Sequence, residues 1–349
     1  MNKTRKGEDM KILSKVAITA ILAASTMALS ANAGTLSDTI KQGFLKCGIN
    51  TGLPGFAEAD ASGKWHGLDV DICRAVAAAV LGDANKVKYV NLNAKERFTA
   101  LQSGEIDLLS RNTTWTETRD TSLGLNFAGV NYYDGQGFMV HKSIGVKSAL
   151  ELDGASVCLQ AGTTTELNLA DYFRSHGMKY KLVSYDTNDQ VLNGYETGRC
   201  DVLTTDQSQL YSLRVKMKDP EKSVVLPEII SKEPLGPVVR QGDDEWFNIV
   251  KWTLFGLISA EEKGITSKNV DDLRAHSKDP EVRRMLGVEG NMAANLHLKK
   301  DWLYNVIKQV GNYGESFDRN VGPKTPLKIK RGLNALWTKG GLQYSPPFR

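Results

Sequence analysis

The feature that most constrains the fold is an alternation of strand-like and helix-like segments that occurs twice along the chain. In the first copy, short apolar runs at 44–50, 87–90 and 106–110 alternate with segments of helical spacing at 68–81 and 94–103. A β-α-β-α-β order of this kind predicts a parallel sheet covered by helices.

The second copy has the same order. Strand-like runs lie at 156–160, 180–185 and 201–205, and helix-like segments lie at 164–176 and 189–197. In each copy a helix ends and a strand begins around the sequence Gly-x-x-Asp, at 104–107 and again at 198–201. Two such units predict two similar lobes.

Two extended segments, 133–141 and 233–239, predict that the chain crosses from one lobe to the other and later returns. We therefore predict an α/β fold of two lobes, each with a parallel-rich sheet flanked by helices, joined by two hinge strands near Val140 and Leu235. Lobe 1 is discontinuous, with residues 34–140 plus 236–349 including a C-terminal extension, and lobe 2 comprises residues 141–235.

The first 33 residues have the pattern of a secretory signal peptide. Five Lys or Arg residues within positions 1–15 precede an uncharged, mostly apolar stretch that ends in Ala-Asn-Ala at 31–33. This pattern predicts export to the periplasm with cleavage after Ala33, and Met10 is an alternative start. The alternative is an uncleaved anchor, but Ser25 and Ser30 dilute the apolar stretch.

Charge argues against nucleic acid as a partner. The net charge is +4, and the signal peptide carries five positive and two negative residues, so the mature chain has a net charge near +1. A nearly neutral chain lacks the basic surface that attracts a phosphate backbone.

All four cysteines lie in the mature part, at Cys47, Cys73, Cys158 and Cys200. An even number in an exported protein favours disulfides, and three pairings are possible. We favour Cys47–Cys73 and Cys158–Cys200, because each pair lies within one predicted lobe; four buried free thiols are the alternative. The wide Cys and His spacings indicate no metal site, and we expect no cofactor.

Ligands of parallel α/β sheets lie beyond the carboxyl ends of the strands. The segment 110–120 follows such a strand and offers Asn112, Thr114 and Arg119. A guanidinium fork and free N–H groups suit a carboxylate. The alternative is a capped turn with Arg119 in a surface ion pair.

Two further segments follow strands of the second copy. In 160–166, Gly162 precedes Thr163, a predicted N-cap with Glu166 at capping-box distance, and Thr163 and Thr164 are candidates to contact the same anion. In 204–208, Asp206 is a candidate to bind an ammonium ion, and a plain helix N-cap is the alternative. Together the three segments predict a cleft for an α-amino acid zwitterion.

The segments taken in order resemble the polar-amino-acid family of periplasmic substrate-binding proteins. The resemblance extends over most of residues 34–294. It depends on 49–56 with 67–72, 100–107, 116–119, 160–164, and 198–201 followed by Asp206. The sequence around Trp115 and the long tail resemble the general L-amino-acid-binding subfamily. The resemblance implies a two-lobe type II periplasmic binding protein.

The resemblance also implies roles for individual residues. Arg119 would bind the α-carboxylate with help from Asn112, Thr114, Thr163 and Thr164, and Asp206 would bind the α-ammonium group. Family members often carry an aromatic residue near Leu53 and Ala94. Here neither is aromatic, which fits a roomier pocket of broad specificity; Phe56, Trp115 and Phe98 are candidates to replace it.

The implied function is capture of free L-amino acids by a monomer that closes at its hinge and delivers them to the inner-membrane permease of an ABC importer. We do not expect an enzyme. The main alternative is a dehydratase-like enzyme on the same scaffold, for which Glu117 and Asp206 are the candidate acid–base groups. A second alternative is an amino-acid-sensing module, which would require a spanning helix or signalling domain that the sequence does not show.

Overall fold

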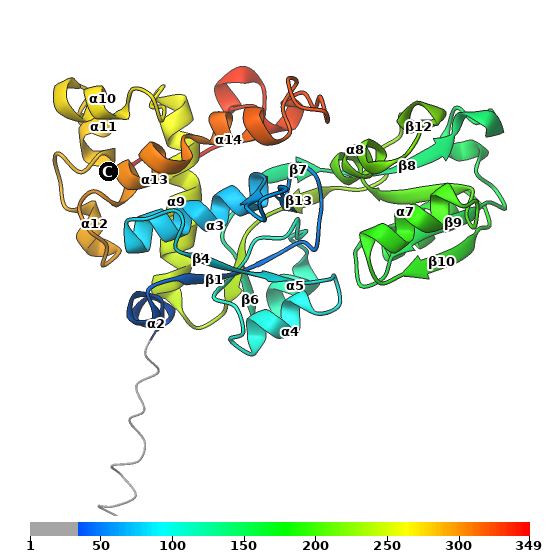
Figure 1. Cartoon of the computed structure of the whole chain (residues 1–349), viewed down its shortest axis with the longest axis horizontal. Helices are drawn as coiled ribbons and strands as arrows, with labels where there is room; N and C mark the ends of the chain where they lie inside the picture. Colours follow the sequence, from blue (N-terminus) through cyan, green and yellow to red (C-terminus); the bar gives the residue numbers. More distant parts are fainter. Residues whose placement is uncertain (1–33) are drawn as a thin grey trace, which may run out of the picture. The chain divides into compact units, whose positions relative to one another are not determined.

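The computed structural model describes residues 34–349, so the signal-peptide prediction for residues 1–33 lies outside the described residues. Residues Thr35–Arg349 form one compact unit that contains two five-stranded sheets (Figure 1). We call the sheet with strand order β4-β1-β5-β14-β6 the first sheet, and the sheet with order β10-β9-β11-β8-β12 the second sheet.

The first sheet contains the predicted first copy of the β-α-β-α-β unit. Strand β1 pairs in parallel with β4 and β5, while β14 runs antiparallel to β5 and β6. The strands are β1 (Leu45–Ile49), β4 (Val87–Asn91), β5 (Leu108–Leu109), β6 (Leu125–Phe127) and β14 (Val238–Arg240). The predicted strands at 44–50, 87–90 and 106–110 are therefore confirmed, the last with shorter bounds.

Helix α3 (Leu68–Leu81) has the predicted bounds, and it ends at Gly82, which takes the left-handed conformation at φ 74°. It packs against β1 on one side and against α9 (Asp244–Glu262) and α13 (Trp302–Val310) on the other. This position explains why its sequence is apolar nearly all round rather than along one stripe. Helix α4 (Arg97–Gln102) packs on the same sheet.

The second sheet contains the second copy. Strands β9 (Ser156–Gln160), β10 (Lys181–Tyr185) and β11 (Val202–Asp206) pair in parallel. Strand β8 (Gln136–His141) lies antiparallel between β11 and β12 (Ser223–Val225). Helices α6 (Thr165–Ser175), α7 (Asn188–Glu196) and α8 (Gln207–Lys216) pack on this sheet.

The chain passes between the sheets through β7 (Tyr132–Asp134) and returns through β13 (Glu233–Leu235), which pair as a two-stranded antiparallel ribbon. The predicted hinge position Leu235 lies in β13. Val140 instead lies inside β8, paired with Val202 and Val224, so the predicted boundary after residue 140 falls within a strand of the second sheet. The chain passes from the ribbon strand β7 to the second-sheet strand β8 at Gly135, where a side chain would collide with Ile229. The sequence 133–141 has an uninterrupted extended pattern, so it does not reveal that the two strands pair with different partners.

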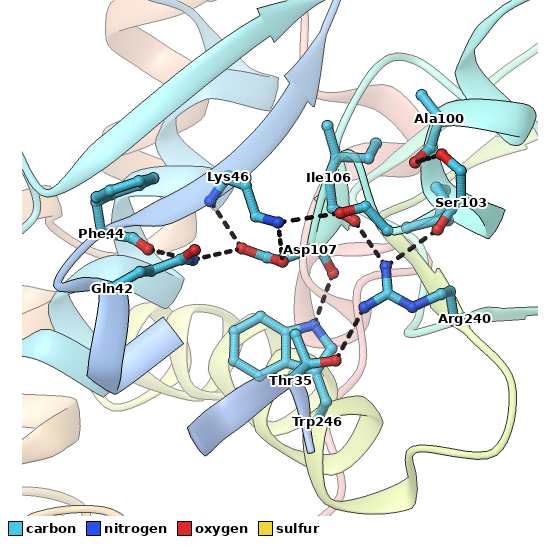
Figure 2. Close-up of polar contacts among 12 residues, drawn as sticks. Thr35, Gln42, Phe44, Lys46, Ala100, Ser103, Ile106, Asp107, Arg240 and Trp246 are labelled. Atoms are coloured by element: carbon cyan, nitrogen blue, oxygen red, sulfur yellow. Dashed lines mark hydrogen bonds and ion pairs between the residues drawn. The ribbon is translucent and has the colours of Figure 1, made fainter. Parts of the chain in front are cut away.

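The two Gly-x-x-Asp sequences have the same structural role. Asp107 accepts hydrogen bonds from the Lys46 backbone N–H at 3.0 Å and from the Gln42 side chain at 3.0 Å (Figure 2). In the second copy, Asp201 accepts one from the Ser156 backbone N–H at 2.9 Å. Each carboxylate thus holds the amino end of a neighbouring parallel strand, at the opposite end of the strands from the predicted ligand-binding segments.

Arg240 and Trp246 complete the polar contacts around Asp107. Arg240 Nη1 donates to the carbonyl oxygens of Leu101 and Ile106 at 3.0 and 2.7 Å, and Trp246 Nε1 donates to the Asp107 carbonyl at 2.8 Å (Figure 2). These bonds tie α9 and β14, which come late in the sequence, to the first β-α-β-α-β unit.

The remaining helices and strands are short. They are α2 (Thr35–Gln42), β2 (Glu58–Ala59), β3 (Trp65–His66), α5 (Glu117–Ser122), α10 (Val270–His276), α11 (Pro280–Met285), α12 (Met292–Asn295), α14 (Tyr313–Asn320) and the 3₁₀ helices η1 (Lys142–Ile144), η2 (Ala149–Glu151), η3 (Pro220–Lys222), η4 (Gly332–Asn334) and η5 (Trp337–Lys339). Among residues 34–349, none of the helices has both the length and the apolar character that a membrane crossing requires.

The C-terminal extension packs on the core of the first sheet and contacts the ribbon between the sheets. Phe317 and Phe348 are buried in the same core as α3. The Asn334 side chain accepts a hydrogen bond from the Tyr133 backbone N–H at 2.7 Å and donates to the Tyr133 carbonyl at 3.0 Å. Tyr313 donates to the Asn131 carbonyl at 2.8 Å. The extension therefore bonds the β7 backbone much as a neighbouring strand would.

The structure pairs the cysteines as we favoured. Cys47 in β1 is bonded to Cys73 in α3 and Cys158 in β9 to Cys200 before β11, with Cα separations of 6.1 and 5.7 Å. Each bond links two segments of the same β-α-β-α-β unit.

Candidate functional site

Segments at the ends of strands of both sheets line a small cavity of about 10 Å³. The residues that line it all have polar or charged side chains. From the first-sheet region they are Arg97, Arg111, Asn112 and Thr114, and from the second-sheet region they are Gln160, Thr163, Thr164, Thr165, Thr205, Asp206 and Gln209. A small polar cavity at the carboxyl ends of the strands is where an α/β sheet presents a ligand site.

The structure brings together Asn112, Thr114, Thr163, Thr164 and Asp206, five of the predicted ligand-binding residues, around this cavity. They come from segments separated by up to 94 positions in the sequence, between Asn112 and Asp206. Only the meeting of the two sheet regions makes them neighbours.

Arg119 lies against the wall of the cavity without being one of its lining residues. Its Nη1 donates to the carbonyl of Thr114, a lining residue, at 2.9 Å, and its guanidinium carbon lies 5.2 Å from the centre of the Phe98 ring. The side chain is 8% exposed. Burial lowers the pKa of Arg119, while Glu233 and Asp206 act against this shift; the guanidinium therefore lies in the field of the carboxylates of the site.

Asp206 has the position of a helix N-cap without the cap hydrogen bond. It precedes α8, yet its side chain accepts no bond from the first turn of that helix. Burial raises the pKa of Asp206 well above its usual range, and Asp134 and Glu233 raise it further. A buried carboxylate beside two other acids favours a cation, so the side chain is suited to an ammonium group.

The threonines that precede α6 differ from the sequence prediction. The N-cap is Thr164 rather than Thr163, and it makes no side-chain cap bond, so the predicted capping box is wrong. The Thr163 hydroxyl donates to the Gln160 carbonyl at 2.8 Å, and the Thr164 hydroxyl donates to Glu233 at 2.9 Å. The helix begins one residue later than the pattern predicts, so Glu166 stands two residues after the N-cap and not three. Gly162 has φ 76°, and a Cβ there would lie 3.0 Å from Lys95, so it allows the two regions to approach closely.

Asn112 bridges the two sides of the cavity. Its side chain accepts a hydrogen bond from Asn50 at 2.9 Å and donates to Gln209 of α8 at 3.0 Å. Its backbone N–H donates to Asp69 at 2.7 Å, and burial raises the pKa of Asp69 to about 6. Asn112 has φ 32°, in the left-handed region that Asn tolerates better than most residues.

Other polar contacts also join the two regions. Ser212 of α8 donates to the Pro54 carbonyl at 2.8 Å, and Lys95 pairs with Asp186 at 2.6 Å. The two sides of the cavity are therefore in direct contact in this arrangement.

The two aromatic residues predicted to contact the ligand lie elsewhere. Phe56 is 1% exposed and packs edge-on against Tyr132, with ring centres 5.4 Å apart, in the core of the first sheet. Trp115 is 38% exposed and stacks on Phe127 at 5.6 Å. Phe98 packs against the guanidinium groups of Arg97 and Arg119 at 4.8 and 5.2 Å. That aromatic ring supports arginines at the cavity and is not itself a lining residue.

Sequence reasoning missed several lining residues, above all two arginines. Arg97 is 2% exposed and Arg111 is 1% exposed. Arg111 lies inside the segment 110–120, directly after β5, and its position next to Asn112 is a usable signal. Arg97 begins α4, and nothing local distinguishes it from a solvated residue of a helix start.

The electrostatics of the two arginines reflect deep burial. Burial lowers the pKa of Arg97 well below its usual range, and the neighbouring Arg111 and Arg119 lower it further. Burial lowers the pKa of Arg111 to about 10, opposed by Asp69. Both groups remain protonated at neutral pH, as guanidinium groups do in proteins. Within residues 34–349, no group of three or more His, Cys, Asp or Glu side chains is arranged to hold a metal ion.

Two sheets joined by a two-stranded ribbon, with a polar cavity lined from both, define a two-lobed binding protein. Residues 45–268 match the family of bacterial extracellular solute-binding proteins, family 3, and the chain belongs to this family. Its fold is the type II fold of periplasmic binding proteins.

Similar proteins match over nearly the whole chain. The general L-amino acid-binding periplasmic protein AapJ of Rhizobium johnstonii is 61% identical over 341 residues, which cover 97% of this chain and 99% of AapJ. The glutamate/glutamine/aspartate/asparagine-binding protein BztA of Rhodobacter capsulatus is 53% identical, with 93% and 96% covered. A solved periplasmic binding protein from Brucella ovis with glutathione bound is 57% identical with a TM-score of 0.89, covering 90% of this chain and 99% of that one.

Proposed function

We propose that this chain is the solute-binding component of an ABC importer and captures free L-amino acids between its two lobes. The observation that carries the proposal is the cavity that Asp206 lines and Arg119 adjoins, because these two residues supply opposite charges from opposite sheets. An α-amino acid is a zwitterion whose two charged groups match that arrangement.

In this proposal each end of the zwitterion has its own partners. Asp206 binds the α-ammonium group, supported by its lack of a cap bond. Arg119 binds the α-carboxylate, with Thr114 and the backbone N–H groups before α6 adding hydrogen bonds. Arg119 can bind the carboxylate directly if its Nη1 exchanges the Thr114 carbonyl for a carboxylate oxygen. If it keeps that bond, its positive charge attracts the carboxylate from behind the lining residues.

The lining of the cavity and the relatives both support an amino acid as the ligand. Every lining side chain is polar or charged, which suits a zwitterion. The relatives are named for general L-amino acids, for glutamate, glutamine, aspartate and asparagine, and for bound glutathione. Glutathione carries a γ-glutamyl group with a free α-ammonium and α-carboxylate, so the same two charges would bind its head group.

Binding is coupled to closure at the ribbon of β7 and β13. The contacts between Asn112 and Gln209 and between Ser212 and Pro54 form only when the lobes meet. A ligand that contacts both lobes favours the closed state through contacts that the open state lacks. In this proposal the closed form, a monomer in the periplasm, is what the inner-membrane permease recognises.

An enzyme on this scaffold has less support. Glu117, one of its two candidate acid–base groups, is exposed at the start of α5 and bonds Thr118 and Thr121. Of the two candidate acid–base groups, Asp206 is then the one left at the cavity, and in this proposal it binds the ligand's ammonium group. Turnover of a candidate substrate in a mass-spectrometric assay would favour the enzyme.

Calorimetry with a panel of glutamate, glutamine, alanine and leucine tests the proposal. Removing one partner of a buried charge pair costs roughly 3–5 kcal/mol, so Arg119→Ala and Asp206→Asn should each weaken binding of every ligand by about two to four orders of magnitude. Arg174→Ala removes a surface arginine whose side chain is 81% exposed and serves as the matched control. Wild-type affinities retained by both cavity variants would refute the proposal.

A further inference from the structure

The C-terminal extension has a strong excess of positive charge. From position 319 to the end, the chain has seven Lys or Arg residues and no Asp or Glu, whereas residues 34–318 have a net charge of −6. Arg319 and Arg331 each pair with an acid of the first-sheet region. The other five are exposed and form no ion pair within residues 34–349; they are Lys324, Lys328, Lys330, Lys339 and Arg349. Basic side chains that the protein does not neutralise itself attract a negatively charged partner.

The same extension exposes a cluster of large apolar side chains. Twelve such side chains are exposed among residues 34–349, and four of them lie within 333–344. They are Leu333, Trp337, Leu342 and Tyr344, each 48–59% exposed. We call these four residues the outer face of the extension. Single exposed hydrophobic residues are ordinary, whereas a cluster of them marks an interaction surface.

Backbone hydrogen bonds hold the outer face together. The Leu342 N–H donates to the Leu333 carbonyl at 2.8 Å, and the Trp337 N–H donates to the Gln343 carbonyl at 2.9 Å. The rings of Trp337 and Tyr344 meet edge to face with their centres 5.6 Å apart. Leu342 and Tyr344 stand on either side of the buried Gln343. The four apolar side chains therefore belong to one surface.

The burial pattern of this segment is the reverse of what folding alone favours. Asn334 and Gln343 are at most 3% exposed. Asn334 bonds the Tyr133 backbone, and the Gln343 side chain donates to the Tyr313 hydroxyl at 3.2 Å. Buried positions usually hold apolar residues and exposed positions hold polar ones. Here the amides lie inside and the apolar side chains lie outside, so a partner that covers the outer face explains its composition better than stability does.

The basic residues at the border of the outer face favour a lipid surface over a protein. Lys330 and Lys339 lie within three residues of Leu333 and Trp337 along the chain and are exposed. Trp, Tyr and Lys are typical of the boundary between water and a bilayer, whereas Lys is depleted where proteins contact each other. A two-fold contact with a second copy would place two surfaces of the same positive charge against each other.

One edge of the outer face carries acids instead. Glu262 and Glu281 line a cavity of about 210 Å³ beside Trp337 and Tyr344, together with Lys263. Lys263 pairs with Glu281 at 2.7 Å, whereas Glu262 forms no ion pair within residues 34–349. Attraction to an anionic surface therefore comes from the lysine side, and Glu262 opposes it.

We propose that the outer face docks on an anionic lipid surface, with Lys330 and Lys339 against the headgroups and the rings of Trp337 and Tyr344 between them. Docking places the binding protein on the membrane and shortens its search for the importer. None of these residues lines the ligand cavity, so the inference goes beyond the proposed function and does not depend on it.

Co-sedimentation of the exported protein with lipid vesicles tests the proposal. The protein should bind vesicles of phosphatidylglycerol mixed with phosphatidylcholine, and it should bind pure phosphatidylcholine at least about tenfold more weakly. Each lysine at an anionic surface raises the partition coefficient by roughly fivefold, so Lys330→Gln combined with Lys339→Gln should lower it by roughly 25-fold. The matched control is Lys142→Gln combined with Lys147→Gln, two exposed lysines beside the exposed Ile144, which should leave vesicle binding unchanged.

Two more variants test the rings and the acidic edge. Trp337→Ser combined with Tyr344→Ser removes roughly 100 Å² of apolar contact and should weaken binding to the anionic vesicles by at least about tenfold. Glu262→Gln removes a repelling charge and should strengthen binding by up to roughly fivefold. Opposite effects of removing charge on the two sides separate docking from a general effect on the fold. Every variant should keep the amino-acid affinity of the wild type, because the cavity is unchanged.

Wild-type protein that binds neither kind of vesicle, or binding that survives the loss of both lysines and both rings, would overturn the proposal. A dimer in analytical ultracentrifugation that the double serine variant dissociates would assign the outer face to a second copy. Retention on the detergent-solubilised permease without any binding to lipid would assign it to a protein partner. Either result also overturns the lipid proposal, and the amino-acid affinity measured in parallel decides the proposed function separately.

Discussion

Replacing Asn334 with alanine removes both hydrogen bonds that join the C-terminal extension to the backbone of β7. Each such bond contributes about 0.5–1.5 kcal/mol to the free energy of unfolding, and their loss leaves the N–H and carbonyl of Tyr133 unpaired. Asn334 is 3% exposed, so water does not readily replace it. We expect a loss of about 2 kcal/mol, which for a chain of this size lowers Tm by roughly 4 °C.

Thermal unfolding followed by circular dichroism gives the global effect, and hydrogen exchange of the Tyr133 amide gives the local one. Exchange should accelerate at this amide more than at amides within β9 or β11, because β7 loses a partner while the second sheet keeps its own. The control is Leu333→Ala, next to Asn334 in η4 with a side chain that is 55% exposed. A Tm within 1 °C of the control, together with unchanged exchange at Tyr133, would refute the claim that the extension holds this strand.

Two further predictions concern pH and the disulfides. Burial raises the pKa of Asp134 to about 6, above its value of about 3.9 in the unfolded chain, so the free energy of unfolding falls as pH rises from about 4 to 6. In urea unfolding of the ligand-free protein, Asp134→Asn should therefore stabilise the fold by about 2–3 kcal/mol at pH 7 and leave its stability unchanged at pH 4. Equal stability of the variant and the wild type at pH 7 would contradict this prediction. The Cys47–Cys73 and Cys158–Cys200 bonds close loops of 26 and 42 residues, and losing them should lower the free energy of unfolding by about 3.5 and 4 kcal/mol, respectively, from chain entropy. Two variants, each with both cysteines of one bond replaced by serine, separate the two effects in denaturant unfolding. An unchanged free energy of unfolding in both variants would show that the bonds do not constrain the unfolded chain.

Local patterns in the sequence predicted the regular elements well. The bounds of α3 agree residue by residue, because its apolar spacing ends at a glycine in the left-handed conformation. The predicted α6 differs from the observed helix by one residue at each end. These signals depend on neighbours along the chain, so they need no knowledge of the tertiary structure.

The site was harder to predict where it depends on packing. Thr163 fits the N-cap pattern, but α6 begins one residue later, with Thr164 as its N-cap. Phe56 lies in a segment that borders the pocket in the resemblance, yet its ring is buried against Tyr132. Arg97 reaches the cavity because α4 packs on the first sheet, a contact that no pattern around residue 97 encodes.

The polar character of the cavity walls has a calorimetric consequence. Removing apolar surface from water is what gives binding a large negative heat-capacity change. Since the lining consists of charged, amide and hydroxyl side chains, contact with a small ligand should leave the binding enthalpy nearly independent of temperature. Any strong temperature dependence would then report the surfaces that the two lobes bury against each other, so that a titration series from cold to warm separates lobe closure from ligand contact.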